Sequence, residues 1–561
     1  MNQKLTLQPA LKPWPRVLGY GLASAAFALQ PALGQNTPGA GSLLQQAEPR
    51  LAPLPLPSGT GLQITPAPTP GLPRSAPFLV QRIEIIGNTV VSTPTLQALL
   101  AQAEGQQLTL AQLGELASRI TSFYRSQGYP LARAIIPVQT IVAGVLRIEV
   151  IEANYGKISV DNQSAVADAV LSAALAPLQS GQVIDQTTLD KALLHIGDVP
   201  GVVVSATLEP GAQVGTSDLN LRLSSGPAVS GNAFFDNNGN TYTGRSRTGA
   251  TVNLLNPLQR GDVLTLGGLS SGSGMNYARL AYEILLNSQG FRLGGSASAL
   301  KYEMDMAKGT ADVQSLWAKQ TLRRSRASNV YARLQFDKLT LRDQAGAAKT
   351  DRHLNNLTAS LAGDLRDAFL DGAVSTWNAS WTGGKLGFDD AAAALANAGT
   401  TNTQGRFLKA NASVSRLQSL GTSSAVYLAV SGQWASRNLD SSQKMLTGGP
   451  ATVRAYDVGA VAGDTGYSAV AEWRQDMGAV WGGQSQALAF IDSAHLTVNK
   501  KLWPQATATN NANLVGAGVG LNFTGSHWNA KSYLATAVGS KSPLVSTDKV
   551  WRAWLEVSRQ F

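Results

Sequence analysis

The stretch Val330-Tyr-Ala-Arg-Leu-Gln-Phe-Asp337 decides the fold of this 561-residue chain, because apolar and polar residues alternate along it. A strand of this sequence has one apolar and one polar face. Similar alternation recurs in 426–434 and 515–523, and throughout 227–561 such blocks are separated by clusters of Gly, Asn, Asp and Ser. Arg, Gln, Asp and Asn recur on the polar face over too many strands for one soluble β-sandwich. We therefore favour a membrane β-barrel with lipid outside and a polar lumen.

The length of this region and the end of the chain support the barrel. At roughly 20 residues for each strand and its turn, residues 227–561 predict about 16 antiparallel strands. The last strand, 551–561, ends on an aromatic residue, as a strand that closes a barrel does. Its alternation predicts lumen-facing Glu556, Ser558 and Gln560, and lipid-facing Leu555, Val557 and Phe561. Arg559 breaks the pattern, but an Arg at the membrane edge can snorkel.

The composition excludes several other classes of protein. Only 14% of residues are charged, and the mean hydropathy of -0.03 fits a barrel whose apolar face is hidden in alternation. No cysteine is present, which excludes disulfides and thiol-based metal or catalytic sites. No catalytic set or nucleotide-binding loop stands out, so we expect neither an enzyme nor a cofactor. The four histidines lack metal-ligand spacing, so no metal site is expected: His195, His353, His495 and His527.

The N-terminus has the features of a secretory signal peptide. Three basic residues precede an apolar stretch, 17–29, and small residues suit a cleavage after Gly34. We therefore predict a signal peptide over 1–34. Its removal takes away three of the bases behind the net charge of +10. With no packed basic motif elsewhere, the charge does not indicate nucleic acid as a partner.

Residues 35–77 predict a short helix and a linker. Gly41 to Glu48 can form one helix that Ser42 caps and Pro49 limits. Eight prolines between Arg50 and Pro77 predict an extended linker without regular helix or paired strand.

Residues 78–226 predict two small α+β domains, 78–154 and 155–226. Each contains elements in the order β-α-α-β-β, with strands over 79–86, 131–138 and 145–151 in the first. Apolar residues lie 3, 8 and 15 positions after Gly105 and again after Gly181. A chance match between two amphipathic helices is the alternative to a tandem repeat.

Four motifs in this order resemble the transporter half of two-partner secretion systems. These are haemolysin secretion/activation proteins, a branch of the Omp85 superfamily. Val80-Gln-Arg-Ile-Glu-Ile-Ile-Gly-Asn88 resembles the start of a polypeptide-transport-associated (POTRA) domain, and Asn256-Pro-Leu-Gln-Arg-Gly-Asp262 resembles an early barrel turn. Gly448-Gly-Pro-Ala-Thr-Val-Arg-Ala-Tyr456, followed by Gly463-Asp464, resembles the family's sixth extracellular loop. Phe490-Ile-Asp492 resembles the wall motif that meets this loop.

The resemblance implies roles for particular residues. The loop tip would be Val453, Arg454, Ala455 and Tyr456, with Ala455 where the family usually has Gly. The loop would fold into the barrel, and Arg454 would pair with Asp492 of the wall, beside Phe490. A charge pair that only stiffens the barrel is the alternative. Phe490 shares the parity of Asp492 and can therefore also face the lumen. The short helix would occupy the pore at rest, although a disordered N-terminus is the alternative.

The resemblance also implies a function. The two POTRA domains would lie in the periplasm, recognise an unfolded secreted partner, a large exoprotein, and pass it through the pore to the cell surface. An open sheet edge can receive a strand from a client, and our candidate edge is Leu131, Ala132, Arg133, Ala134, Ile135, Ile136 and Val138. A rigid spacer is the alternative for these domains. An outer-membrane assembly insertase and a passive porin-type channel remain alternatives for the whole protein, whose expected location is the outer membrane, in contact with its lipid.

Overall fold

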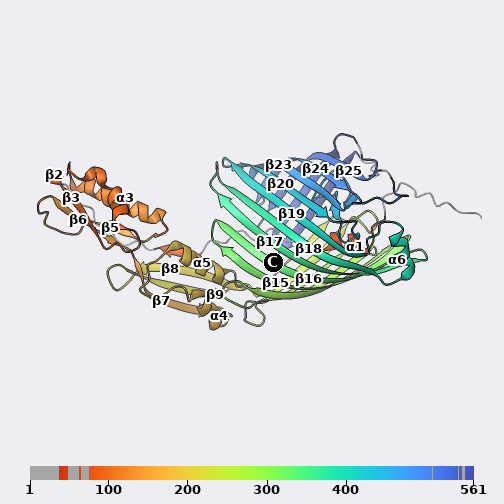
Figure 1. Ribbon diagram of the computed structural model, residues 1–561, viewed down its shortest axis with the longest axis horizontal. Helices are drawn as coiled ribbons and strands as arrows, with labels where there is room; N and C mark the ends of the chain where they lie inside the picture. Colours follow the sequence, from red (N-terminus) through yellow and green to blue (C-terminus); the bar gives the residue numbers. More distant parts are fainter. Residues whose placement is uncertain (1–36, 49–61, 65–74, 508, 541, 546–549) are drawn as a thin grey trace, which may run out of the picture.

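The protein consists of two small α/β units and a closed barrel (Figure 1). The computed structural model describes residues 37–48, 62–64, 75–507, 509–540, 542–545 and 550–561. The predicted signal peptide, 1–34, and most of the proline-rich linker lie outside these residues. Among the residues described, no helix is both long enough and apolar enough to cross a membrane.

Sixteen antiparallel strands form the barrel, which confirms the predicted strand number. Each strand pairs with its neighbour, and β10 pairs with β27 to close the sheet. The strands are β10 (Val229–Asp236), β11 (Arg247–Leu255), β12 (Val263–Ser270), β13 (Met275–Leu285), β14 (Arg292–Met304), β15 (Ala307–Arg324), β16 (Ser328–Ala345), β17 (Ala348–Asp367), β18 (Ala373–Phe388), β19 (Gly405–Leu420), β20 (Ser424–Ala435), β23 (Thr465–Val480), β24 (Gly483–Thr497), β25 (Asn511–Thr524), β26 (Trp528–Ala537) and β27 (Trp551–Gln560).

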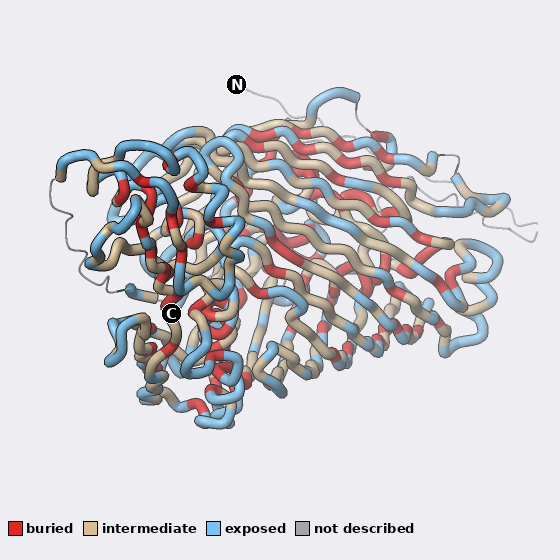
Figure 2. Tube along the Cα trace, turned by 60° about the vertical axis from the view of Figure 1, so that its left-hand side comes forward, coloured by how far each residue is buried: buried red, intermediate tan, exposed pale blue. Residues whose placement is uncertain are grey.

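The alternation that predicted the barrel is visible in side-chain exposure along its strands (Figure 2). Leu334 and Phe336 of β16 are exposed on the outside, whereas Arg333 and Asp337 line the interior cavity. On β27, Leu555 is exposed and Trp554 is buried inside. The apolar outer face and polar inner face arise from a side-chain period of two residues.

In the first small unit, a three-stranded sheet in the order β3-β6-β5 packs against α3. Strands β3 and β6 are parallel, and β5 and β6 are antiparallel. Its elements are β2 (Phe78–Val80), β3 (Arg82–Ile86), α2 (Thr93–Ala98), η1 (Ala101–Ala103), β4 (Gln106–Leu108), α3 (Leu110–Ser126), β5 (Arg133–Ile135) and β6 (Val145–Ile151). The strand predicted over 131–138 is shortened to β5, because Pro130 and Pro137 flank it and lack an N–H for the ladder.

The second unit has a four-stranded sheet in the order β1-β8-β9-β7, packed against two helices. Its elements are β1 (Leu62–Ile64), β7 (Asn154–Gln163), α4 (Asp168–Leu175), α5 (Gln186–Gly197), β8 (Val202–Pro210) and β9 (Thr216–Ser225). Strand β1 pairs in parallel with β8, so the prediction that the linker contains no paired strand was wrong. No proline lies between Pro57 and Pro66, which leaves this segment free to donate its N–H groups.

The second unit lies against one rim of the barrel. Arg324, at the end of β15, donates to both carboxylate oxygens of Asp198 at 2.7 Å. In the turn after β15, Arg326 donates to Asp190 of α5 at 2.5 Å. Ala167 N–H donates to the carbonyl of Gln259, in the turn between β11 and β12. This rim therefore faces the small α/β units, and α6 (Ala391–Ala398) lies at the opposite end (Figure 1).

Candidate functional site: the inward loop and the barrel wall

The long connection between β20 and β23 folds into the barrel. It contains a short hairpin formed by β21 (Met445–Thr447) and β22 (Val461–Gly463). At its tip, Gly448 and Gly449 have φ of 96° and 94°, a conformation that only glycine adopts readily. Its four predicted tip residues are all buried: Val453, Arg454, Ala455 and Tyr456.

Arg454 and Asp492 are brought together inside the barrel. The Arg454 guanidinium donates from Nε to Asp492 Oδ2 at 2.9 Å and from Nη2 to Oδ1 at 2.6 Å. The backbone N–H of Arg454 donates to the same Oδ2 at 3.0 Å. Asp492 is completely buried on β24. A two-pronged pair with an additional backbone donor fixes both the position and the orientation of the loop tip.

A second carboxylate that sequence reasoning missed completes the site. Glu472 of β23 accepts from Arg454 Nη1 at 2.7 Å. Its other oxygen accepts from Arg474 at 2.9 Å and 2.6 Å. Two carboxylates and two guanidinium groups therefore balance each other in a buried position. The sequence feature that could have revealed this carboxylate is the spacing of Glu472 and Arg474. Side chains two positions apart on one strand lie on the same face, here the face toward the lumen.

Phe490 faces the lumen and contacts the Arg454 side chain. The guanidinium carbon lies 3.4 Å from the Phe490 ring centroid and 5.1 Å from that of Tyr533. The two rings meet edge to face at 6.1 Å. A positive, partly dehydrated group thus has two aromatic neighbours, which stabilise it because aromatic rings attract cations.

The backbone of the loop tip is held by the last strand, a contact the sequence did not indicate. Trp554 Nε1 donates to the carbonyl of Arg454 at 2.7 Å, and Arg552 Nε donates to that of Ala455 at 3.0 Å. Arg552 also pairs with Asp457, which accepts from Arg245 at 2.7 Å. The tip is therefore held from β23, β24 and β27 at once.

Ala455, where the family usually has Gly, fits without a left-handed backbone. It is not among the described residues with positive φ. Its methyl group lies over Gly516 of β25, where an added Cβ would come within 2.6 Å of it. A small residue on the wall thus makes room for the Ala455 methyl group.

Helix α1 (Ala40–Ala47) lies inside the barrel, where the plug helix was expected. Leu43 and Leu44 pack among apolar side chains of β13 to β19. The N–H of Ala40 donates to Asp343 at 2.7 Å, and Arg247 donates to the carbonyl of Gln46 at 3.2 Å. Gly39 rather than Ser42 is the N-cap, because Ser42 lies within the helix and its hydroxyl donates to Gly39. The predicted limit at Pro49 lies outside the described residues.

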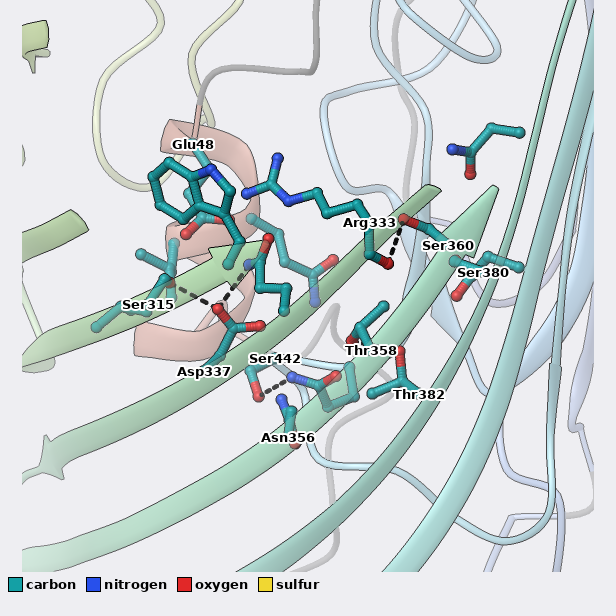
Figure 3. A pocket seen from close by; sticks show the side chains of 18 of the residues that line it. Glu48, Ser315, Arg333, Asp337, Asn356, Thr358, Ser360, Ser380, Thr382 and Ser442 are labelled. Atoms are coloured by element: carbon teal, nitrogen blue, oxygen red, sulfur yellow. Dashed lines mark hydrogen bonds between the residues drawn. The ribbon is translucent and has the colours of Figure 1, made fainter. Parts of the chain in front are cut away.

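A polar cavity of about 1140 Å³ remains beside α1 (Figure 3). Glu48 lines it from the helix side, and Ser442 and Thr452 line it from the loop. Its wall is formed mainly by hydroxyl and amide side chains, including Ser315, Asn356, Thr358, Ser360, Ser380 and Thr382. The helix and the loop therefore leave part of the lumen open to water.

The candidate client-binding edge, Leu131 to Val138, includes β5 and the residues beside it. Strand β5 forms one edge of its sheet. The N–H of Ala134 is not free, because it donates to Thr121 Oγ1 of α3 at 2.9 Å. Val138 is fully exposed. The regular part of the edge is thus three residues long and partly occupied by a side chain.

The chain has the fold of a closed β-barrel preceded by small α/β units, with a loop anchored in its lumen. Residues 78–153 match the family described as POTRA domain, ShlB-type. Residues 215–523 match the family described as Haemolysin secretion/activation protein ShlB/FhaC/HecB. The chain belongs to this second family. It is therefore an outer-membrane transporter of two-partner secretion, which translocates a secreted partner protein.

Curated relatives resemble the chain over most of its length, and a solved structure shares its fold. The chain is 28% identical to the Heme/hemopexin transporter protein HuxB of Haemophilus influenzae (strain 86-028NP), over 97% of both chains. It is 24% identical to the Outer membrane transporter CdiB of Dickeya dadantii, over 80% of this chain and 81% of the relative. The solved structure of CdiB from Escherichia coli superposes with a TM-score of 0.66 at 19% identity, covering 89% of this chain and 93% of that one.

Proposed function

We propose that 35–77 contains the plug helix and its linker, that 78–154 and 155–226 are two POTRA domains, and that 227–561 is the barrel. Two POTRA domains are supported by a shared topology. In the first unit β6 pairs in parallel with β3 and antiparallel with β5. In the second unit β9 pairs in parallel with β7 and antiparallel with β8.

The first unit is proposed to receive the client at the β5 edge, within Leu131 to Val138. An extended client can add to a sheet edge through its own backbone. To reach the N–H of Ala134 it must displace the Thr121 hydroxyl, which is a neutral and replaceable partner. At rest the Thr121 hydroxyl therefore occupies the N–H of Ala134, and a client strand can replace it with a backbone carbonyl.

The barrel is proposed to alternate between a plugged and an open state. The observation that carries this proposal is that α1 and the Arg454 tip both lie inside the barrel. An unfolded chain can pass only after α1 leaves the lumen. Arg454, Asp492 and Phe490 hold the loop in its inward position meanwhile. Transport needs no catalytic step, and client folding outside the cell would supply the driving force.

The client is proposed to be one large exoprotein dedicated to this transporter. Deleting the gene should remove one large protein from the medium and retain it inside the cell. Failure of many barrels to assemble would instead indicate an insertase. A change in solute uptake alone would indicate a passive channel.

Two variants test the proposed edge in opposite directions. Ala134→Pro removes the N–H that a client strand would use, so we expect export to fall while the barrel stays folded. Thr121→Val removes the competing hydroxyl and leaves that N–H free, so export should stay normal or rise. Equal export by both variants would argue that the first unit is only a spacer.

A further inference from the structure

Three outward-facing cations form a row on the outer surface of the barrel. Lys338 of β16 pairs in register with Asn355 of β17, which pairs with Lys385 of β18, which pairs with Arg406 of β19. All three cations are exposed. We call Lys338, Lys385 and Arg406 the basic row. Because adjacent strands lie about 4.8 Å apart, the row spans roughly 14 Å along the surface.

An apolar row lies directly below the basic row on the same face. This row lies two positions along the strands from the basic row, on the side of the periplasmic rim. In it Phe336 pairs with Leu357, Leu357 with Gly383, and Gly383 with Leu408. Their exposed fractions are 43% for Phe336, 52% for Leu357 and 60% for Leu408. The surface thus changes from apolar to cationic within one side-chain repeat, as it would where hydrocarbon meets lipid headgroups.

The basic row has no carboxylate partner among the described residues. By contrast, nearby Arg342 pairs with Asp312 at 3.0 Å, and His353 pairs with Asp389 at 2.7 Å. Three neighbouring cations without counter-charges attract an anion. Lys and Arg bind phosphate oxygens through several N–H donors each.

The position of the basic row along the strands shows which leaflet of the outer membrane it faces. Strand β16 starts near Arg324, which binds Asp198 of the second unit, and runs away from the periplasmic rim toward Lys338. The β18–β19 connection that follows Lys385 carries α6, at the end of the barrel opposite the two units (Figure 1). The basic row therefore lies on the side of the cell surface.

We propose that the basic row binds a phosphate-bearing lipid of the outer leaflet. Its phosphates contact Lys338, Lys385 and Arg406, and its acyl chains lie along the apolar row below. Gly383 carries no side chain between Leu357 and Leu408, and Leu408 Cδ2 lies 3.5 Å from the position that a Cβ of residue 383 would take. The bound lipid fixes the depth of the longest strands in the membrane.

The test compares lipid binding by detergent-purified full-length protein after delipidation. The probes are a bis-phosphorylated lipid A and the same lipid without phosphates, each detected by native mass spectrometry. Wild-type protein should prefer the phosphorylated form. The triple variant Lys338→Gln, Lys385→Gln, Arg406→Gln should lose on the order of 100-fold in affinity for it, because each basic residue near an anionic lipid surface contributes on the order of fivefold.

A matched variant removes three exposed cations elsewhere: Arg82→Gln, Arg119→Gln and Lys157→Gln. It should bind the phosphorylated lipid as wild type does, and all three proteins should show heat-modifiable gel mobility. Equal binding of both lipids by wild type, or unchanged binding by the triple variant, would overturn the proposal. Displacement of the lipid by millimolar inorganic phosphate would also overturn it, since the row would then be a site for a free anion.

Discussion

The guanidinium of Arg454 and the carboxylate of Asp492 meet in a two-pronged pair, with Nη2 to Oδ1 at 2.6 Å and Nε to Oδ2 at 2.9 Å. The two residues lie 38 positions apart in the chain, on the loop and on β24. Removing Arg454 leaves the fully buried Asp492 carboxylate without its charge partner, and breaking a buried pair in this way typically costs about 3–5 kcal/mol. The pair can therefore determine whether the loop stays inside the barrel.

Arg454→Ala should abolish export while the barrel still folds, because neighbouring strand ladders are independent of the loop. Export is measured as client in the medium, and folding as heat-modifiable mobility. Arg454→Lys should also fail largely, since an ammonium cannot make the two-pronged pair. Arg416→Ala is the control: it removes a partly exposed pair with Asp367, on the rim of the barrel that faces the second unit, and should leave export normal. Normal export by Arg454→Ala would contradict a role for the loop.

Leu43→Asp should release the plug helix. Leu43 is completely buried among apolar side chains of the barrel wall, where a carboxylate has no partner. We expect a higher open probability in planar bilayer conductance recordings. The control is Leu395→Asp on α6, an exposed helix outside the lumen, which should leave the conductance unchanged. Equal conductance of the two variants would show that α1 does not obstruct the pore.

Arg324→Ala should loosen the second unit from the barrel. Arg324 is buried and binds both oxygens of Asp198, so its loss leaves that carboxylate without its main partner. Hydrogen exchange in 186–199 should accelerate, and export should fall. Arg147→Ala, which removes an exposed pair with Glu84, is expected to change exchange little because exposed pairs contribute about 0–1 kcal/mol. Unchanged exchange in both variants would mean that other contacts hold the unit.

The first unit should lose stability in acid through Glu152. Burial alone would raise the pKa of this carboxyl, but hydrogen bonds from Thr89, Tyr124 and the N–H of Val90 hold the pKa below its usual range. Because the folded-state pKa is the lower one, the stabilisation is complete above the usual pKa of Glu. It is lost as pH falls through the folded-state pKa. Hydrogen exchange in 110–126 of full-length protein measures it.

Glu152→Gln keeps the shape of this side chain but cannot ionise. The variant should be less stable near neutral pH, where it lacks the charge-assisted bonds, and its stability should depend less on pH in acid. A variant with the same acid dependence as wild type would assign that dependence to another group.

The pairings inside the lumen were the least predictable part of the site. Arg454 and Asp492 were found through their motifs, but Glu472, Trp554 and Arg552 were not. These three lie on β23 and β27, and only barrel closure brings their strands beside the loop. Similarly, β1 was missed because a three-residue strand is stable only through its pairing with β8.

The sequence by itself determined the architecture, because that information is local. Alternation in 227–561 specifies strands with an apolar and a polar face, and the total length sets the number of strands. The tertiary structure decided which polar groups meet. A buried charge requires a partner, and that partner comes from whichever strand or loop the closed barrel places opposite it. The position of α1, the four-residue network around Arg454 and the uncompensated row of Lys338, Lys385 and Arg406 all depend on that closure.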